Sequence, residues 1–250
     1  MSRQLLFYDQ VTPLSSQRHA KWCIDGSTQR YQFSSGVNSV PVTAIEIPPA
    51  AREYSIVFAG GDDAIVPVVI LGIEGNENLY VNADGTWNAR YVPAFVRRYP
   101  FVFARSDDGG TFTLCIDESW DGCNQENRGQ RLFDDEGNRT EYLQNVLNFL
   151  QDYQKHFLRT QAYCAKLKEL ELLEPQQARF KLAGGEERTL AGFSAVNRDK
   201  LKKLPAEKLS ELAQTDELEL TYTHLQSMNN LSYMLQRAAE RRREKSDDAS

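Results

Sequence analysis

The chain has 250 residues, of which 41% are hydrophobic and 26% are charged, so it can bury a sizeable core as one large domain or two modest ones. Its formal net charge of −6 argues against a general nucleic-acid binder, because such proteins usually present a basic face. No apolar run approaches the roughly 20 residues that a membrane-spanning helix needs, and the apolar run at residues 5–8 is too short for a secretory signal. We therefore predict a cytoplasmic protein, with the cell surface as the alternative if a leader has been removed.

The first half of the chain is predicted to be rich in strands. Residues 1–27 mix proline, serine and glycine with scattered apolar residues, which indicates an irregular N-terminal arm. From residue 28, apolar and polar residues alternate, as at Tyr31 and Phe33, which is typical of a half-buried strand. Further strands are predicted, from β-branched and aromatic content, at residues 40–47, 54–58, 64–73, 78–81, 101–104 and 111–116. The turn at residues 107–110 predicts the clearest hairpin.

Two adjacent arginines, Arg97 and Arg98, lie in an aromatic stretch that is bracketed by two prolines. Pro93 suits the start of a short helical turn, because a proline at the first helical position loses only an N–H that would be unpaired anyway. Pro100 restricts Tyr99 to an extended conformation, so the turn should end there.

A long helix is predicted where the apolar spacing changes at Asn138 from two to alternating three and four. It should run from about residue 139 to 170, roughly 48 Å at 1.5 Å per residue. Asn138 with Glu141 resembles a capping box at its start. The apolar stripe is wide, which favours packing onto a sheet over a free coiled coil.

A smaller unit is predicted after Pro175. It begins with a hairpin, formed by residues 178–182 and 188–196 around the turn 183–186. A short helix should follow Asn197 or Asp199, and a second helix should cover residues 206–213. Asp216 then opens a final helix, whose basic end at 237–245 is interpreted as a solvated terminus that suits the helix dipole.

These elements predict an α+β fold, in which an antiparallel, partly barrel-like sheet is packed by one long helix and followed by a smaller hairpin-plus-helices unit. The predicted organisation is the arm at 1–27, a β-rich body with the long helix at 28–175, a hairpin and helical subdomain at 176–240, and a flexible tail at 241–250.

Several phrases of the sequence, taken together and in order, resemble the SapC family. Among them are NSVP at 38–41, YSIVF at 54–58, DGTW at 84–87, YVPAF at 91–95, RRYPF at 97–101, CIDE at 115–118 and YTHL at 222–225. The resemblance covers most of residues 31–235. Ser55 is one departure, since relatives commonly have proline after the tyrosine.

The resemblance implies little about chemistry. The family name is tied to a bacterial surface-layer role. Members are often encoded beside flavin-dependent tryptophan halogenases, cupin-like proteins and outer-membrane receptors. A halogenase or an outer-membrane receptor system is therefore the partner that the resemblance implies, and no catalytic residues come with it.

The sequence predicts no metal site and no cofactor. His19, His156 and His224 stand alone, without the spacing of paired metal ligands, and no phosphate-binding loop or GxSxG motif occurs. The four cysteines form no CxxC pair, and free thiols are expected in the cytoplasm. A bridge between Cys115 and Cys123 is the alternative for an exported protein.

The arginine pair is the main candidate for a binding site. Adjacent residues of a helical turn point about 100° apart, so one arginine is expected to face inward. That arginine either has a structural role, paired with Glu46 or Asp117, or binds an anionic ligand bidentately. The candidate ligand-binding residues are Arg97, Arg98, Tyr99, Glu46, Asp117, Glu118 and His224.

The leading functional hypothesis is a non-enzymatic binding or accessory protein that acts with partner proteins and recognises an anionic ligand through an arginine site. One alternative is an enzyme with an unfamiliar site around the arginine pair, the acids at 117–118 and His224. The other alternative is a surface-layer component.

Overall fold

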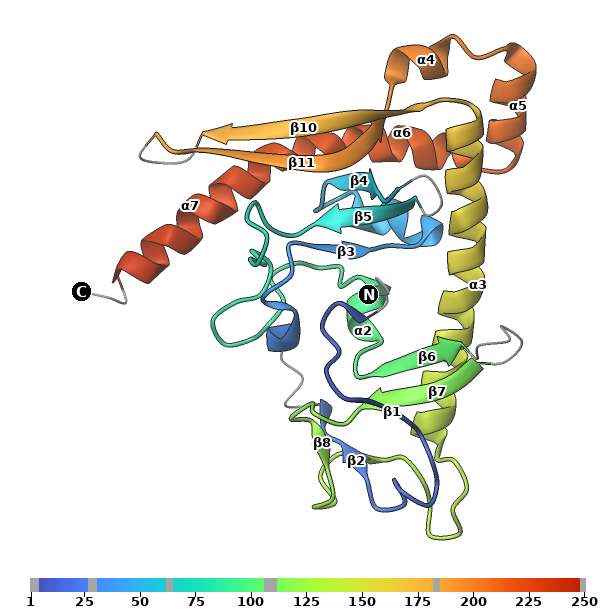
Figure 1. Ribbon diagram of the computed structural model, residues 1–250, viewed down its shortest axis with the longest axis vertical. Helices are drawn as coiled ribbons and strands as arrows, with labels where there is room; N and C mark the ends of the chain where they lie inside the picture. Colours follow the sequence, from blue (N-terminus) through green and yellow to red (C-terminus); the bar gives the residue numbers. More distant parts are fainter. Residues whose placement is uncertain (1–4, 27–30, 62–64, 106–111, 182–184, 248–250) are drawn as a thin grey trace.

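The computed structural model describes residues 5–26, 31–61, 65–105, 112–181 and 185–247, in which helices are combined with antiparallel sheets (Figure 1). This confirms the predicted α+β class. Within these ranges the strands form three separate sheets, and none closes into a barrel. The predicted turn at 107–110 lies outside the described residues, and the turn at 183–186 lies partly outside them.

The largest sheet carries the main core. Its five strands are, in spatial order, β10 (Leu173–Lys181), β11 (Glu187–Val196), β4 (Ile56–Ala59), β5 (Val66–Ile70) and β3 (Ser39–Pro41). Every residue of β5 is buried, as its β-branched sequence predicts. The C-terminal hairpin joins this sheet, because Ser194 of β11 pairs with Phe58 of β4.

Two smaller sheets lie at the other end of the molecule (Figure 1). One contains β1 (Val11–Pro13), β7 (Phe112–Asp117) and β6 (Phe101–Arg105), so the predicted hairpin of the last two strands is present. The other contains β8 (Cys123–Asn124), β2 (Cys23–Ile24) and β9 (Gln130–Arg131). The N-terminal segment, residues 5–26, thus supplies β1 to the first of these two small sheets and β2 to the second.

Three predicted strands are wrong in whole or in part, because local hydrogen bonds replace a sheet ladder. Residues 31–33 begin the 3₁₀ helix η3 (Tyr31–Ser34), in which the Ser34 hydroxyl donates to the Tyr31 carbonyl at 2.7 Å. The strand predicted over 40–47 ends at Pro41 and continues as η4 (Ala44–Glu46) and α1 (Ile47–Ala50). Residues 78–81 make only an isolated bridge, between Val81 and Trp87.

The long helix is α3 (Glu141–Glu169), and it runs beside both the large sheet and the β6–β7 hairpin (Figure 1). Leu143 and Leu150 pack into the smaller core, whereas Tyr163 and Leu167 pack into the larger one. The helix therefore joins the two cores, as its wide apolar stripe predicts.

The predicted cap of this helix is wrong. Thr140 is the N-cap and accepts from the Leu143 N–H. Asn138 instead closes the preceding turn, because its N–H donates to the Asp134 carboxylate at 2.7 Å.

The last helices are α4 (Arg198–Lys202), capped by Asn197, then α5 (Ala206–Gln214), α6 (Glu217–Ser227), η5 (Met228–Asn230) and α7 (Leu231–Asp247). The predicted final helix is interrupted at η5. There the Ser227 hydroxyl accepts from the Ile56 N–H of β4, and the Asn230 amide donates to the Tyr54 carbonyl, just before that strand.

All four cysteines are free thiols, as predicted. Among the described residues, no helix combines the length and the apolar character that crossing a bilayer requires.

Candidate functional site

The two arginines lie at the C-terminal end of α2 (Ala94–Arg97), the helical turn that Pro93 begins. Arg98 is buried, whereas Arg97 is exposed. Arg98 is 5% exposed. Its guanidinium carbon lies 4.1 Å from the ring centroid of Phe95 and 5.2 Å from that of Tyr153, so it is stacked among aromatic rings. This confirms that one of the two arginines faces inward, and it ties α2 to α3.

Arg97 is the exposed member of the pair. Its Nε donates to the Val92 carbonyl at 3.0 Å, and its guanidinium carbon lies 5.2 Å from the Phe149 ring centroid. Within the described part of the chain, no ion pair involves Arg97. Its guanidinium therefore lies at the surface, beside the rings of Tyr91 and Phe149.

A cavity of about 250 Å³ lies beside this arginine, between α2, the start of β6 and the first half of α3. Its wall combines guanidinium, aromatic and amide groups. They include Arg97, Tyr99, Trp120, Tyr142, Asn145 and Phe149. The structure thus brings Arg97, Arg98 and Tyr99 to one cavity, where flat apolar surfaces adjoin a cation.

Glu46 is held by backbone N–H groups and by a tyrosine. Its buried carboxylate accepts from the Thr43 N–H at 2.8 Å, the Tyr91 hydroxyl at 2.8 Å and the Ala94 N–H at 2.7 Å. It therefore caps both η4 and α2. Burial, with Glu46 acting in the same direction, raises the pKa of Tyr91, so this hydroxyl stays a donor.

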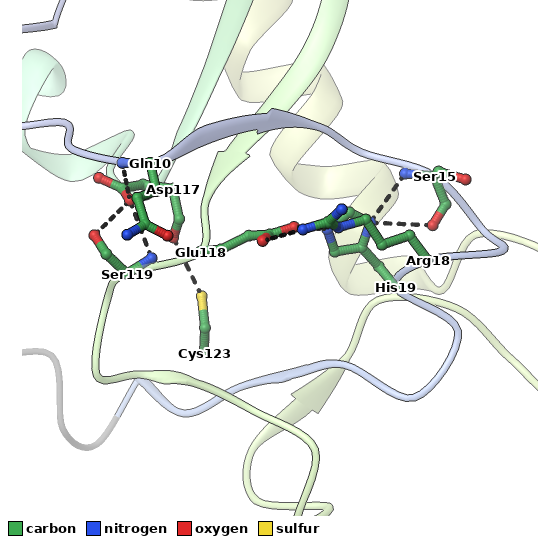
Figure 2. A network of polar contacts seen from close by, with 8 residues as sticks. All are labelled: Gln10, Ser15, Arg18, His19, Asp117, Glu118, Ser119 and Cys123. Atoms are coloured by element: carbon green, nitrogen blue, oxygen red, sulfur yellow. Dashed lines mark hydrogen bonds and ion pairs between the residues drawn. The ribbon is translucent and has the colours of Figure 1, made fainter.

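Asp117, at the end of β7, is fully buried and holds the N-terminal segment (Figure 2). Its carboxylate accepts from the Asp9 N–H at 2.8 Å, the Gln10 N–H at 3.1 Å and the Ser119 hydroxyl at 2.6 Å. The Tyr99 hydroxyl also donates to it, at 3.3 Å. Burial acts to raise the pKa of Asp117, but these donors outweigh it and leave that pKa lowered. These donors join the end of β7 to the N-terminal segment and to Tyr99. The pairing of an arginine with Glu46 or Asp117 stays a prediction.

Glu118 points to the other side of the strand end, toward the N-terminal segment (Figure 2). Arg18 binds its carboxylate in a bidentate manner, at 2.7 and 2.6 Å, and His19 Nε2 lies 3.0 Å from it. The Ser15 N–H donates to His19 Nδ1, which places the proton of a neutral ring on Nε2. The Arg18 guanidinium holds the pKa of Glu118 below its usual value, and His19 acts in the same direction.

Sequence analysis missed this group of Ser15, Arg18 and His19 around Glu118. About a hundred residues separate them from Glu118 along the chain. Sequence patterns of helices, strands and turns relate residues only a few positions apart, so they cannot predict such a contact. Neither carboxylate lines the cavity at Arg97.

His224 lies apart from the arginines, in the larger core beneath the large sheet. Its Nε2 accepts from the Val196 N–H at 3.1 Å, so Nδ1 carries the proton and faces the Ile56 carbonyl at 2.9 Å. Burial lowers the pKa of His224 to about 4. The imidazole is therefore neutral at pH 7 and joins α6 to β4 and β11.

The site residues predicted from the sequence thus lie in four places: the arginines with Tyr99, then Glu46, the acids at 117–118, and His224. Arg97, Arg98 and Tyr99 line the cavity of about 250 Å³. Cys123 lies near the acids, with its thiol 3.6 Å from the Asp117 carbonyl, and burial raises the pKa of that thiol to about 12. Within the described residues, no group of three metal-binding side chains comes together.

The model of the SapC family matches residues 14–234, which confirms the resemblance seen in the sequence. No curated protein and no solved structure matches the chain.

Proposed function

We propose that this chain, which belongs to the SapC family by its match over residues 14–234, is a non-enzymatic accessory protein that binds an anionic ligand at Arg97. The observation that carries the proposal is the position of this guanidinium. It lies at the edge of an aromatic cavity and takes part in no ion pair among the described residues.

The chemistry of the wall suggests the class of ligand. A ring or another flat apolar group can stack between Trp120, Tyr142 and Phe149, and such contacts bury large apolar areas. A carboxylate or phosphate attached to that group can then accept two parallel hydrogen bonds from the Arg97 fork. We propose an aromatic group that carries an oxyanion, free or within a partner protein.

The partners proposed for this accessory role follow from the family resemblance. They are a flavin-dependent halogenase or an outer-membrane receptor system. The enzymatic and surface-layer alternatives stay predictions. For the enzymatic one, the carboxylates of Asp117 and Glu118 are held by other groups of the chain (Figure 2).

The ligand site can be tested with phenylacetate as the anionic probe and 2-phenylethanol as its uncharged analogue. Binding is followed by the fluorescence of Trp120, which lines the cavity, and a Trp120→Phe variant identifies that signal. Phenylacetate should bind more tightly than the alcohol. Arg97→Gln should weaken it by about 10- to 100-fold, since a hydrogen bond to a charged group contributes about 1.5–3 kcal/mol.

The matched control is Arg159→Gln, which removes an exposed arginine from α3, at a distance from the cavity wall. It should leave binding unchanged. Equal affinity of wild type and Arg97→Gln for phenylacetate, with both proteins folded, would contradict the proposed site.

The accessory role needs a separate test. Cross-linking in the native organism, followed by identification of the attached proteins, should recover a partner, and Arg97→Gln should reduce its yield. Turnover of a metabolite by the purified chain, with no partner recovered, would favour the enzymatic alternative.

A further inference from the structure

A second cavity, of about 390 Å³, lies on another part of the surface and shares no lining residue with the cavity at Arg97. It is bounded by the turn after α1, by the loop at residues 88–90 and by one face of η5 and α7. Its wall is polar and includes Arg52, Glu53, Arg90, Asn230, Arg237 and Glu240. Its size falls in the usual range for small-molecule sites, about 300–1,000 Å³.

The charges of this wall leave two arginines without an anionic partner among the described residues. The Glu53 carboxylate already has partners within the chain. It accepts from the backbone N–H groups of Arg90 and Tyr91, and it lies 3.7 Å from the Arg90 guanidinium. Arg52 and Arg237 take part in no ion pair within the described ranges. Three guanidinium groups against two carboxylates give this cavity a net charge of +1 in a chain of net charge −6.

Arg237 is held in an orientation suited to an oxyanion. Its guanidinium carbon lies 4.3 Å from the ring centroid of Tyr80, so one face of the group is covered by the ring. The edge of the planar fork carries the N–H donors and stays available, which is the geometry that carboxylates and phosphates match.

Asn230 supplies a hydrogen-bond acceptor, its amide oxygen, in a fixed position. It is 9% exposed, and its amide nitrogen donates to the carbonyls of Ala51 and Tyr54, both at 2.8 Å. These two bonds use both N–H groups and fix the amide plane. Its Oδ1, together with the Glu240 carboxylate, can accept from hydroxyl groups of a ligand.

From this arrangement we infer a second binding site, for a small hydroxylated molecule that carries one oxyanion, of the sugar-phosphate or sugar-acid class. The oxyanion would lie between Arg52 and Arg237, and the hydroxyl groups would face Asn230 and Glu240. This site goes beyond the proposed function at Arg97, and it would give the protein a polar ligand next to α7.

The test is a calorimetric titration of the full chain with glucose 6-phosphate and with glucuronate, using glucose and inorganic phosphate as part-ligands. At least one of the two anionic sugars should bind saturably at millimolar concentration, and glucose and phosphate should each bind at least about 10-fold more weakly, since both ends contribute. Binding of only one anionic sugar would identify the phosphate or the carboxylate as the preferred group.

Variants locate the site. Arg52→Gln, at an exposed position, and Arg237→Lys, which keeps the charge but loses the fork, should each weaken binding by about 10-fold or more. Arg97→Gln serves as the control, because it alters the other cavity and should leave this affinity unchanged. The inference is overturned if neither sugar binds saturably, if glucose binds as tightly as its charged analogues, or if Arg52→Gln binds as the wild type does.

Discussion

Replacement of His224 tests whether a buried, neutral imidazole holds the large sheet to the C-terminal helices. In the folded chain its pKa is about 4, against 6.5 for an ordinary histidine. Between these values the unfolded chain binds a proton that the folded ring does not, so stability falls as pH falls. From pH 7 to pH 5 this residue alone should lower the free energy of unfolding by about 2 kcal/mol.

The measurement is urea unfolding of the wild type and of His224→Gln at pH 7 and pH 5, followed by circular dichroism. The variant keeps a polar side chain but cannot titrate, so its loss of stability between the two pH values should be smaller by about 2 kcal/mol. His156→Gln is the control, because this half-buried histidine of α3 contacts Thr160 through its backbone carbonyl and not through its ring.

A second variant separates the hydrogen bonds from the charge. His224→Leu leaves the Val196 N–H and the Ile56 carbonyl without this partner, which should cost about 2–6 kcal/mol at pH 7. The same loss of stability between pH 7 and pH 5 in the wild type and in His224→Gln would refute the reasoning, whatever the result for leucine.

Four further changes probe single side chains by urea unfolding. Thr140→Ala removes the α3 cap and should cost about 1 kcal/mol, and an unchanged midpoint would contradict that role. Ser55→Ala removes a buried hydroxyl that has no hydrogen-bond partner among the described residues. We therefore expect the free energy of unfolding to rise by about 1 kcal/mol. A fall would show that this hydroxyl does have a partner. Arg98→Lys should cost about 1–2 kcal/mol, because an ammonium group stacks less well on Phe95 than a planar guanidinium; equal stability would argue against the stacking. Asp117→Asn should be less stable than wild type at pH 7. The difference should shrink below about pH 4, because wild-type Asp117 loses its stabilising charge as pH falls through its lowered pKa. A constant difference would show that the charge is not involved.

The sequence by itself determined those features that depend on neighbours along the chain. The spacing of apolar residues after Asn138 predicts α3, because one face of a helix must be apolar to pack. Pro93 predicts the start of α2, and the 100° step between adjacent helical residues predicts that Arg98 and Arg97 face different environments.

Only the tertiary structure decided which groups meet. Glu118 binds Arg18 and His19 across about a hundred residues, and His224 bonds to backbone groups of β4 and β11. Glu46 caps two helical turns by accepting from the N–H groups of Thr43 and Ala94. A buried carboxylate or imidazole must be satisfied, but many donors can satisfy it, and the chain path alone selects among them. Local patterns therefore determine which residues are buried, whereas their hydrogen-bond partners depend on how distant segments are brought together.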